Sequence, residues 1–145
     1  RNCSTKYPFI TDYRGLAAYT IRKVDVQVSA TLQSRSGPEL VATYNVPTAE
    51  VARTLGRPLA GGAANVAVNL LNPGQLYGDR VTQVDFRIAK ILRFGRTRTN
   101  IGIDFYNVTN SSTTLTYNNT YGATWLRPQT FMPARFVKIT GQLSF

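Results

Sequence analysis

Two aspartates and one arginine are the side chains whose types and spacing come closest to a catalytic site. Asp85 and Arg87 lie in one segment, Asp104 lies in the next, and the short turn Gly95-Arg96 separates the two segments. A hairpin with this turn would place the carboxylates of Asp85 and Asp104 approximately opposite each other, and such a pair can act as general acid and general base. Because Arg87 lies close by, a network of ion pairs explains the same residues more simply. We therefore predict that the protein is not an enzyme.

The composition excludes several other kinds of site. The chain has no histidine and one cysteine, Cys3, so neither a Ser-His-Asp triad nor a zinc site built on His or several Cys is possible. Gly61-Gly62 lacks the strand and the lysine that a phosphate-binding loop needs. We expect no metal and no cofactor. Cys3 is either a free thiol or half of a disulfide with a cysteine upstream of Arg1 or in another chain.

The charge balance points to an anionic partner other than nucleic acid. The chain of 145 residues carries 17 Lys and Arg against 7 Asp and Glu, a net charge of +10. The basic residues are scattered along the chain and form no compact run, so we do not predict nucleic-acid binding. Attraction to anionic lipid head groups or to an anionic solute fits this distribution better.

Alternating apolar and polar residues predict the elements that position these side chains. In Val81–Phe94 one side carries Val84, Phe86 and Ile88, and the other carries Asp and Arg. Strands show this period of two because successive side chains point to opposite faces. The stretches with this pattern are Thr11–Ile21, Val24–Arg35, Val81–Phe94, Thr99–Thr109 and Ala134–Phe145.

A charged face opposite an apolar face distinguishes two architectures. In a small soluble sandwich the polar face would be the outside, whereas in a wide barrel the apolar face meets lipid and the charged face meets a water-filled lumen. We predict an all-β fold of antiparallel strands, about five of them forming the wall of a transmembrane β-barrel. The candidates for the lumen-facing side are Asp85, Arg87, Arg93 and Asp104; those for the lipid-facing side are Val84, Phe86, Ile88, Ile101, Ile103 and Phe105.

Residues 11–145 resemble the C-terminal end of TonB-dependent outer-membrane receptors. The resemblance rests on the order and spacing of Asp79–Lys90 (DRVTQVDFRIAK), Asp104–Asn110 (DFYNVTN), Pro133–Phe136 (PARF) and the final Phe145. It is strongest to the large Oar-like receptors with a carboxypeptidase-regulatory-like domain at the N-terminus. Tyr106 departs from the pattern, since the family usually has the Phe-Asn pair directly.

This resemblance implies a location in the bacterial outer membrane and solute uptake driven through the TonB system. The plug domain and the TonB box of such receptors are missing from residues 1–145, which we therefore expect to be the C-terminal segment of a barrel domain. The apolar ladder of Val137, Ile139, Leu143 and Phe145 resembles the C-terminal signal that the barrel-insertion machinery reads.

Two long connections are expected on the same side of the membrane as the N-terminal loop. Barrels of this type have short inner turns and long outer loops, which predicts that residues 36–80 and 110–133 are outer loops. Within the first, Leu40–Val46 and Ala64–Leu71 are candidates for a hairpin, and Thr48–Leu55 for a short helix capped by Thr48.

The second long loop carries Tyr117, Tyr121 and Trp125. These aromatic side chains either contact a ligand or pack against the loop itself and the membrane interface.

Five strands are too few for a closed barrel, because the smallest single-chain outer-membrane barrels have eight. We therefore expect partners at the strand edges: the remaining barrel strands on another chain, or further copies of this chain. Two alternatives to a receptor segment remain open. The first is a soluble or filament-forming homo-oligomeric β assembly whose apolar faces meet one another, and the second is a loop-borne adhesion or glycan-binding module.

Overall fold

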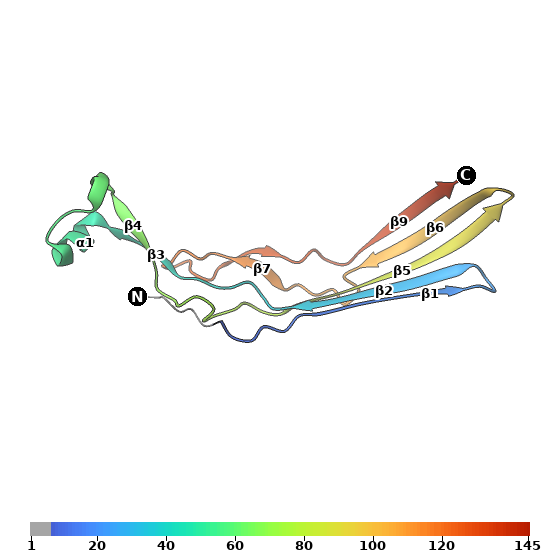
Figure 1. Ribbon diagram of the computed structural model, residues 1–145, viewed down its shortest axis with the longest axis horizontal. Coiled ribbons are helices and arrows are strands. Elements are labelled where there is room, and N and C mark those ends of the chain that lie inside the picture. The colour runs from blue at the N-terminus through green and yellow to red at the C-terminus, as the bar shows by residue number, and fades with distance from the viewer. Residues whose placement is uncertain (1–6) are drawn as a thin grey trace.

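The chain folds into an elongated, predominantly β structure (Figure 1). The computed structural model describes residues 7–145, so the prediction about Cys3 lies outside the described residues. The strands are β1 (Tyr13–Ile21), β2 (Val26–Arg35), β3 (Thr43–Pro47), β4 (Asn65–Asn69), β5 (Val81–Phe94), β6 (Thr97–Tyr106), β7 (Thr114–Tyr117), β8 (Pro128–Phe131) and β9 (Phe136–Ser144). The helical elements are α1 (Thr48–Leu55) and a short 3₁₀ turn, η1 (Ala60–Gly62).

The five stretches with alternating residues form one antiparallel sheet, as predicted. Its strand order is β1-β2-β5-β6-β9, and every neighbouring pair is antiparallel. A two-residue turn at Gly95-Arg96 joins β5 to β6, and Gly95 adopts a φ of 59° there. Hairpin turns of this length need a positive φ, which glycine adopts without steric penalty.

The register aligns apolar residues in rows across the whole sheet on one face and polar residues on the other. One apolar row consists of Tyr19, Val28, Ile88, Ile103 and Ile139. The adjacent row on the opposite face consists of Ala18, Ser29, Arg87, Asp104 and Lys138.

At the centre of the sheet, burial of these two faces is the reverse of that in a soluble sheet, whereas β1 and β9 are largely exposed on both faces. On the apolar face, Ile88 is 41% exposed, Ile103 is 43% exposed and Ile139 is 77% exposed. On the polar face, Ala89 is 1% exposed and Asp104 is 5% exposed. Besides strand pairing, the main contact between elements of residues 7–145 joins α1 to β3, so no helix or second sheet packs extensively on the apolar face.

The two ends of the sheet differ in the length of their connections. The turns after β1 and β5 lie at one end, and the long connections 36–80 and 107–135 lie at the other, together with residues 7–12 (Figure 1). The short turns and the long connections therefore lie at opposite ends of the sheet; whether the long connections are outer loops stays a prediction.

The first long loop contains the predicted hairpin, β3–β4. The helix α1 lies between these two strands in the chain and contacts β3. The helix has the predicted bounds, but the predicted capping role of Thr48 is wrong. No side chain caps the N-terminus of α1, and the Thr48 hydroxyl instead accepts a hydrogen bond from the backbone N–H of Leu59 at 3.1 Å. The second long loop contains a hairpin that was not predicted, β7–β8.

The sheet is open within residues 7–145. Strands β1 and β9 each pair with a neighbour on one side only, which leaves two edges with unpaired backbone groups. In the same part of the chain, no helix is long and apolar enough to cross a membrane.

The two ends of the first long loop pack closely at Gly37, and a substitution there tests this packing. A Cβ atom at Gly37 would lie far inside van der Waals contact of the carbonyl oxygens of Gly78 and Asp79. We expect Gly37→Ala to lower the free energy of unfolding by about 1–3 kcal/mol, the range for overpacked sites. Urea unfolding monitored by tryptophan fluorescence measures the change.

Gly15→Ala is the control, because the added Cβ would meet only the Leu32 Cβ at 3.9 Å. This variant should be neutral or more stable by up to about 1 kcal/mol, since alanine loses less backbone entropy than glycine on folding. Equal stability of the two variants would contradict the packing described at Gly37.

Candidate functional site

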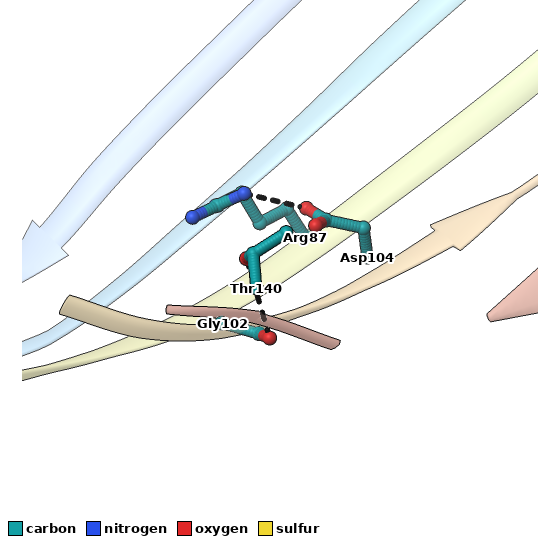
Figure 2. Close-up of polar contacts among 4 residues, drawn as sticks. All are labelled: Arg87, Gly102, Asp104 and Thr140. Atoms are coloured by element: carbon teal, nitrogen blue, oxygen red, sulfur yellow. Dashed lines mark hydrogen bonds and ion pairs between the residues drawn. The ribbon is translucent and has the colours of Figure 1, made fainter. Parts of the chain in front are cut away.

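The polar face of the sheet is organised by an ion pair between neighbouring strands. Arg87 on β5 lies directly opposite Asp104 on β6, and Arg87 Nη1 donates a hydrogen bond to Asp104 Oδ1 at 2.8 Å (Figure 2). The Asp104 side chain is 8% exposed and that of Arg87 is 33% exposed. The second carboxylate oxygen of Asp104 is buried without a hydrogen-bond partner.

The predicted pairing of Asp85 with Asp104 is wrong. A two-residue turn at Gly95-Arg96 pairs Phe94 with Thr97, and counting back from this pair places Arg87, not Asp85, opposite Asp104. Asp85 is bound separately: its carboxylate accepts hydrogen bonds from the Gln83 amide at 2.8 and 3.0 Å and from the backbone N–H of Asn107 at 2.9 Å. The two carboxylates therefore serve different structural contacts.

A glycine makes room for the Arg87 guanidinium. Gly102 lies next to Asp104 on the same face, two residues earlier, and a Cβ at this position would lie 2.9 Å from Arg87 Nη2 and 2.9 Å from Thr140 Oγ1. The Thr140 hydroxyl donates to the Gly102 carbonyl at 3.4 Å (Figure 2). The guanidinium thus extends across the β6 backbone toward β9, where any larger residue at position 102 would displace it.

A depression of about 270 Å³ lies beside the ion pair. Residues of β2, β5 and β6 line it: Ser29, Thr31, Asp85, Arg87, Asp104 and Tyr106 of the polar face, together with Ala30, Phe86 and Phe105. These groups can hold water or a polar solute group by hydrogen bonds. Among residues 7–145, no three metal-ligating side chains converge to bind a metal ion.

Arg93 lies on the same face but belongs to a different, more exposed contact. Its Nη2 binds the Asp25 carboxylate at 2.9 Å, and the two side chains are 65% and 37% exposed. Asp25 lies in the turn between β1 and β2 and adopts a φ of 49°. The four predicted charged residues therefore divide into the Arg87–Asp104 ion pair, the separately bound Asp85, and Arg93, whose partner Asp25 was not among them.

Asn107 is a buried organiser of the second long loop that sequence reasoning missed. It is 2% exposed and adopts a φ of 50°, a conformation that Asn tolerates better than most residues. Its amide donates to the carbonyls of Ser111 at 2.9 Å and Pro133 at 2.7 Å, so it ties both ends of the loop together. The signal in the sequence was an asparagine directly after a strand, a frequent turn position.

Of the three aromatic residues predicted as ligand candidates, two come together. Tyr121 and Trp125 lie 5.9 Å apart between ring centroids, and Tyr44 from the first long loop packs edge-on against Tyr121 at 6.2 Å. The Trp125 indole N–H donates to the Val41 carbonyl at 2.9 Å, which joins the two long loops. Tyr117 lies elsewhere, against Gly78.

Tyr44 extends this aromatic group to the helix. Its hydroxyl donates to the Glu50 carboxylate at 3.2 Å, and this hydrogen bond raises the pKa of Tyr44 above its ordinary value.

The apolar ladder near the C-terminus lies on the outer strand β9. Val137, Ile139 and Leu143 share the apolar face of the sheet, and together with Phe145 they are more than half exposed.

Comparison with known proteins gives no match: no family model fits the chain, and neither a curated protein nor a solved structure resembles it at a significant level.

The two ion pairs of the polar face provide a matched test of the site. Arg87→Met leaves the buried Asp104 carboxylate without its charged partner, and we expect a loss of about 3 kcal/mol in the free energy of unfolding. Arg93→Met removes an exposed pair with Asp25 and should cost less than about 1 kcal/mol. Chemical denaturation of both variants under the same conditions measures the difference. Similar losses would show that burial of Asp104 contributes nothing to the pair.

Proposed function

We propose that this chain is a wall segment of a bacterial outer-membrane barrel of the TonB-dependent receptor type. The observation that carries the proposal is the reversed burial at the centre of the sheet. The apolar face is exposed or half-exposed on all five strands, whereas Ala89, Ile91 and Asp104 on the opposite face are buried. An exposed apolar surface of this width is unfavourable in water and marks a surface that contacts lipid or another apolar surface.

Strand length and connection length support a membrane location. The five strands have 9 to 14 residues, and a barrel strand tilted in an outer membrane needs about 9–11. The short turns and the long loops lie at opposite ends, as in outer-membrane barrels. In this orientation the β3–β4 and β7–β8 hairpins and the aromatic group of Tyr44, Tyr121 and Trp125 project from the outer surface.

The polar face then borders the lumen. Arg87, Asp104 and the neighbouring depression line it, and the ion pair neutralises two charges that would otherwise repel or attract a passing solute. The receptor activity, solute uptake driven by TonB, rests on the resemblance of residues 79–90 and 104–110 to these receptors. In this proposal the exposed ladder of β9 is also recognised during membrane insertion.

The open edges of β1 and β9 require partner strands. Unpaired N–H and C=O groups cost several kcal/mol each in lipid, where no water can bind them. The remaining strands of the receptor would satisfy both edges. Copies of the same chain satisfy them equally well, so the same edges also favour the alternative of a homo-oligomeric β assembly, in which apolar faces cover one another.

Two consecutive alanines on β1 provide a matched test of which face meets lipid. Ala17 belongs to the apolar row with Ala30, Phe86, Phe105 and Val137, whereas Ala18 belongs to the polar row with Arg87 and Asp104. Both are exposed. We expect Ala17→Arg to destabilise the chain in phosphatidylcholine vesicles by about 2–4 kcal/mol, the penalty for Arg near the midplane.

Ala18→Arg makes the same chemical change on the water-facing side and should alter stability by no more than about 0.5 kcal/mol. Equilibrium unfolding in urea from the vesicle-bound state measures both variants. Equal penalties, or a larger penalty at Ala18, would overturn the facing assignment and with it the proposed membrane role.

A further inference from the structure

The end of the sheet that carries the short turns is strongly basic. We call this region the turn end; its basic residues are Arg22, Lys23, Lys90, Arg93, Arg96 and Arg98. All six are exposed. A single acidic residue, Asp25, lies among them and binds Arg93. The other six acidic residues of the chain lie further along the sheet or in the long loops, so positive charge is concentrated at the turn end.

The position of Lys90 shows where the positive charge lies relative to the apolar face. Lys90 belongs to the apolar row with Val26 and Ile101, yet its ammonium group extends to the turn after β1 and donates to the Val24 carbonyl. A lysine on an apolar surface behaves this way when its stem covers apolar area and its charge reaches a polar layer. The polar layer implied by this geometry lies at the level of the turn after β1.

Apolar side chains flank the basic ones at the same level. Ile21 is 39% exposed, Val24 is 49% exposed and Phe94 is 65% exposed. Basic and apolar residues side by side, with few acids, are typical of surfaces that lie at the boundary between lipid head groups and hydrocarbon.

The arginines also leave positive charge uncompensated. Arg93 and Arg98 lie directly opposite each other, an arrangement that is unfavourable for like charges. Asp25 compensates Arg93, but within residues 7–145 no carboxylate lies within ion-pair distance of Arg98, Arg96, Arg22 or Lys23. Anions supplied from outside would remove this repulsion.

We propose that the turn end docks anionic phospholipid head groups, with Arg22, Lys23, Lys90 and Arg96 closest to the lipid phosphates. Arg93 and Arg98 contribute to the local positive potential from the polar face. This inference rests on the proposed membrane role and adds to it a lipid preference for the leaflet that contacts the turns. The physical basis is Coulomb attraction, which increases partitioning by about fivefold for each basic side chain near an anionic surface.

The test uses the full 145-residue chain with two kinds of vesicle, one of phosphatidylcholine alone and one with a third of phosphatidylglycerol. At about 0.1 M salt, where charges act over about 10 Å, we expect at least about a hundredfold stronger partitioning into the anionic vesicles. At about 1 M salt the preference should disappear, because screening shortens that range to about 3 Å. Sedimentation with the vesicles measures the bound fraction.

A pair of double variants separates a local surface from a general effect of net charge. Arg22→Gln with Lys23→Gln removes two charges at the turn end and should reduce the preference for anionic vesicles by about 25-fold. Arg53→Gln with Arg57→Gln removes two exposed charges at the opposite end, in and after α1, and should leave the preference unchanged.

Each remaining outcome is decisive. Equal loss in both double variants would overturn the proposed docking surface, because net charge alone would then explain the preference. Equal insertion of the unmodified chain into both vesicles would overturn it while leaving the membrane role intact. Binding to neither vesicle would overturn both.

Discussion

Coverage of the exposed apolar face is the condition on which the rest of this structure depends. Each Ile, Val or Phe side chain that leaves water contributes about 1.5–3 kcal/mol, and the sheet presents such side chains in rows across five strands. Because no helix or second sheet of residues 7–145 packs extensively on them, further burial of these side chains depends on the medium or on a partner. In the proposed membrane location, lipid would provide this cover without requiring a complementary shape, and the long strands and the separation of short turns from long loops support that proposal.

The polar face satisfies a complementary requirement, since charged groups on it must be paired where they are buried. Arg87 and Asp104 meet this requirement through the strand register, and Gly102 leaves the space that the guanidinium occupies. The Oδ2 atom of Asp104 has no hydrogen-bond partner. Lys138 on β9 lies directly opposite Asp104 in the strand pairing. The Arg87–Asp104 ion pair thus joins β5 to β6 at the centre of the sheet, while the long loops are held by local contacts of Asn107 and Trp125.

Local sequence patterns were sufficient to predict the five strands of the sheet, the bounds of β5, and the hairpin and helix of the first long loop: the strands from a period of two, the helix from a candidate N-cap at Thr48. They were not sufficient for the pairing of Asp85, because register depends on how many residues the turn contains, and a shift of two residues changes the partner without changing the face. The β7–β8 hairpin was missed because its strands have four residues each and little apolar alternation. Contacts between distant loops, such as Trp125 with Val41, and the contact of Arg93 with Asp25 depend on tertiary placement that local patterns do not encode.

The most direct test of the account is a cysteine scan of β5 in a Cys3→Ser background, with a nitroxide label placed at each residue from Val84 to Ile91 in turn. Collision rates with oxygen, which concentrates in lipid, and with a water-soluble nickel complex distinguish the two faces of a membrane-inserted strand. The account predicts alternation, with oxygen favoured at Val84, Phe86 and Ile88 and the nickel complex at Asp85 and Arg87. Protection of Val84, Phe86 and Ile88 from both reagents would contradict it, because the apolar face would then be covered by protein and not by lipid.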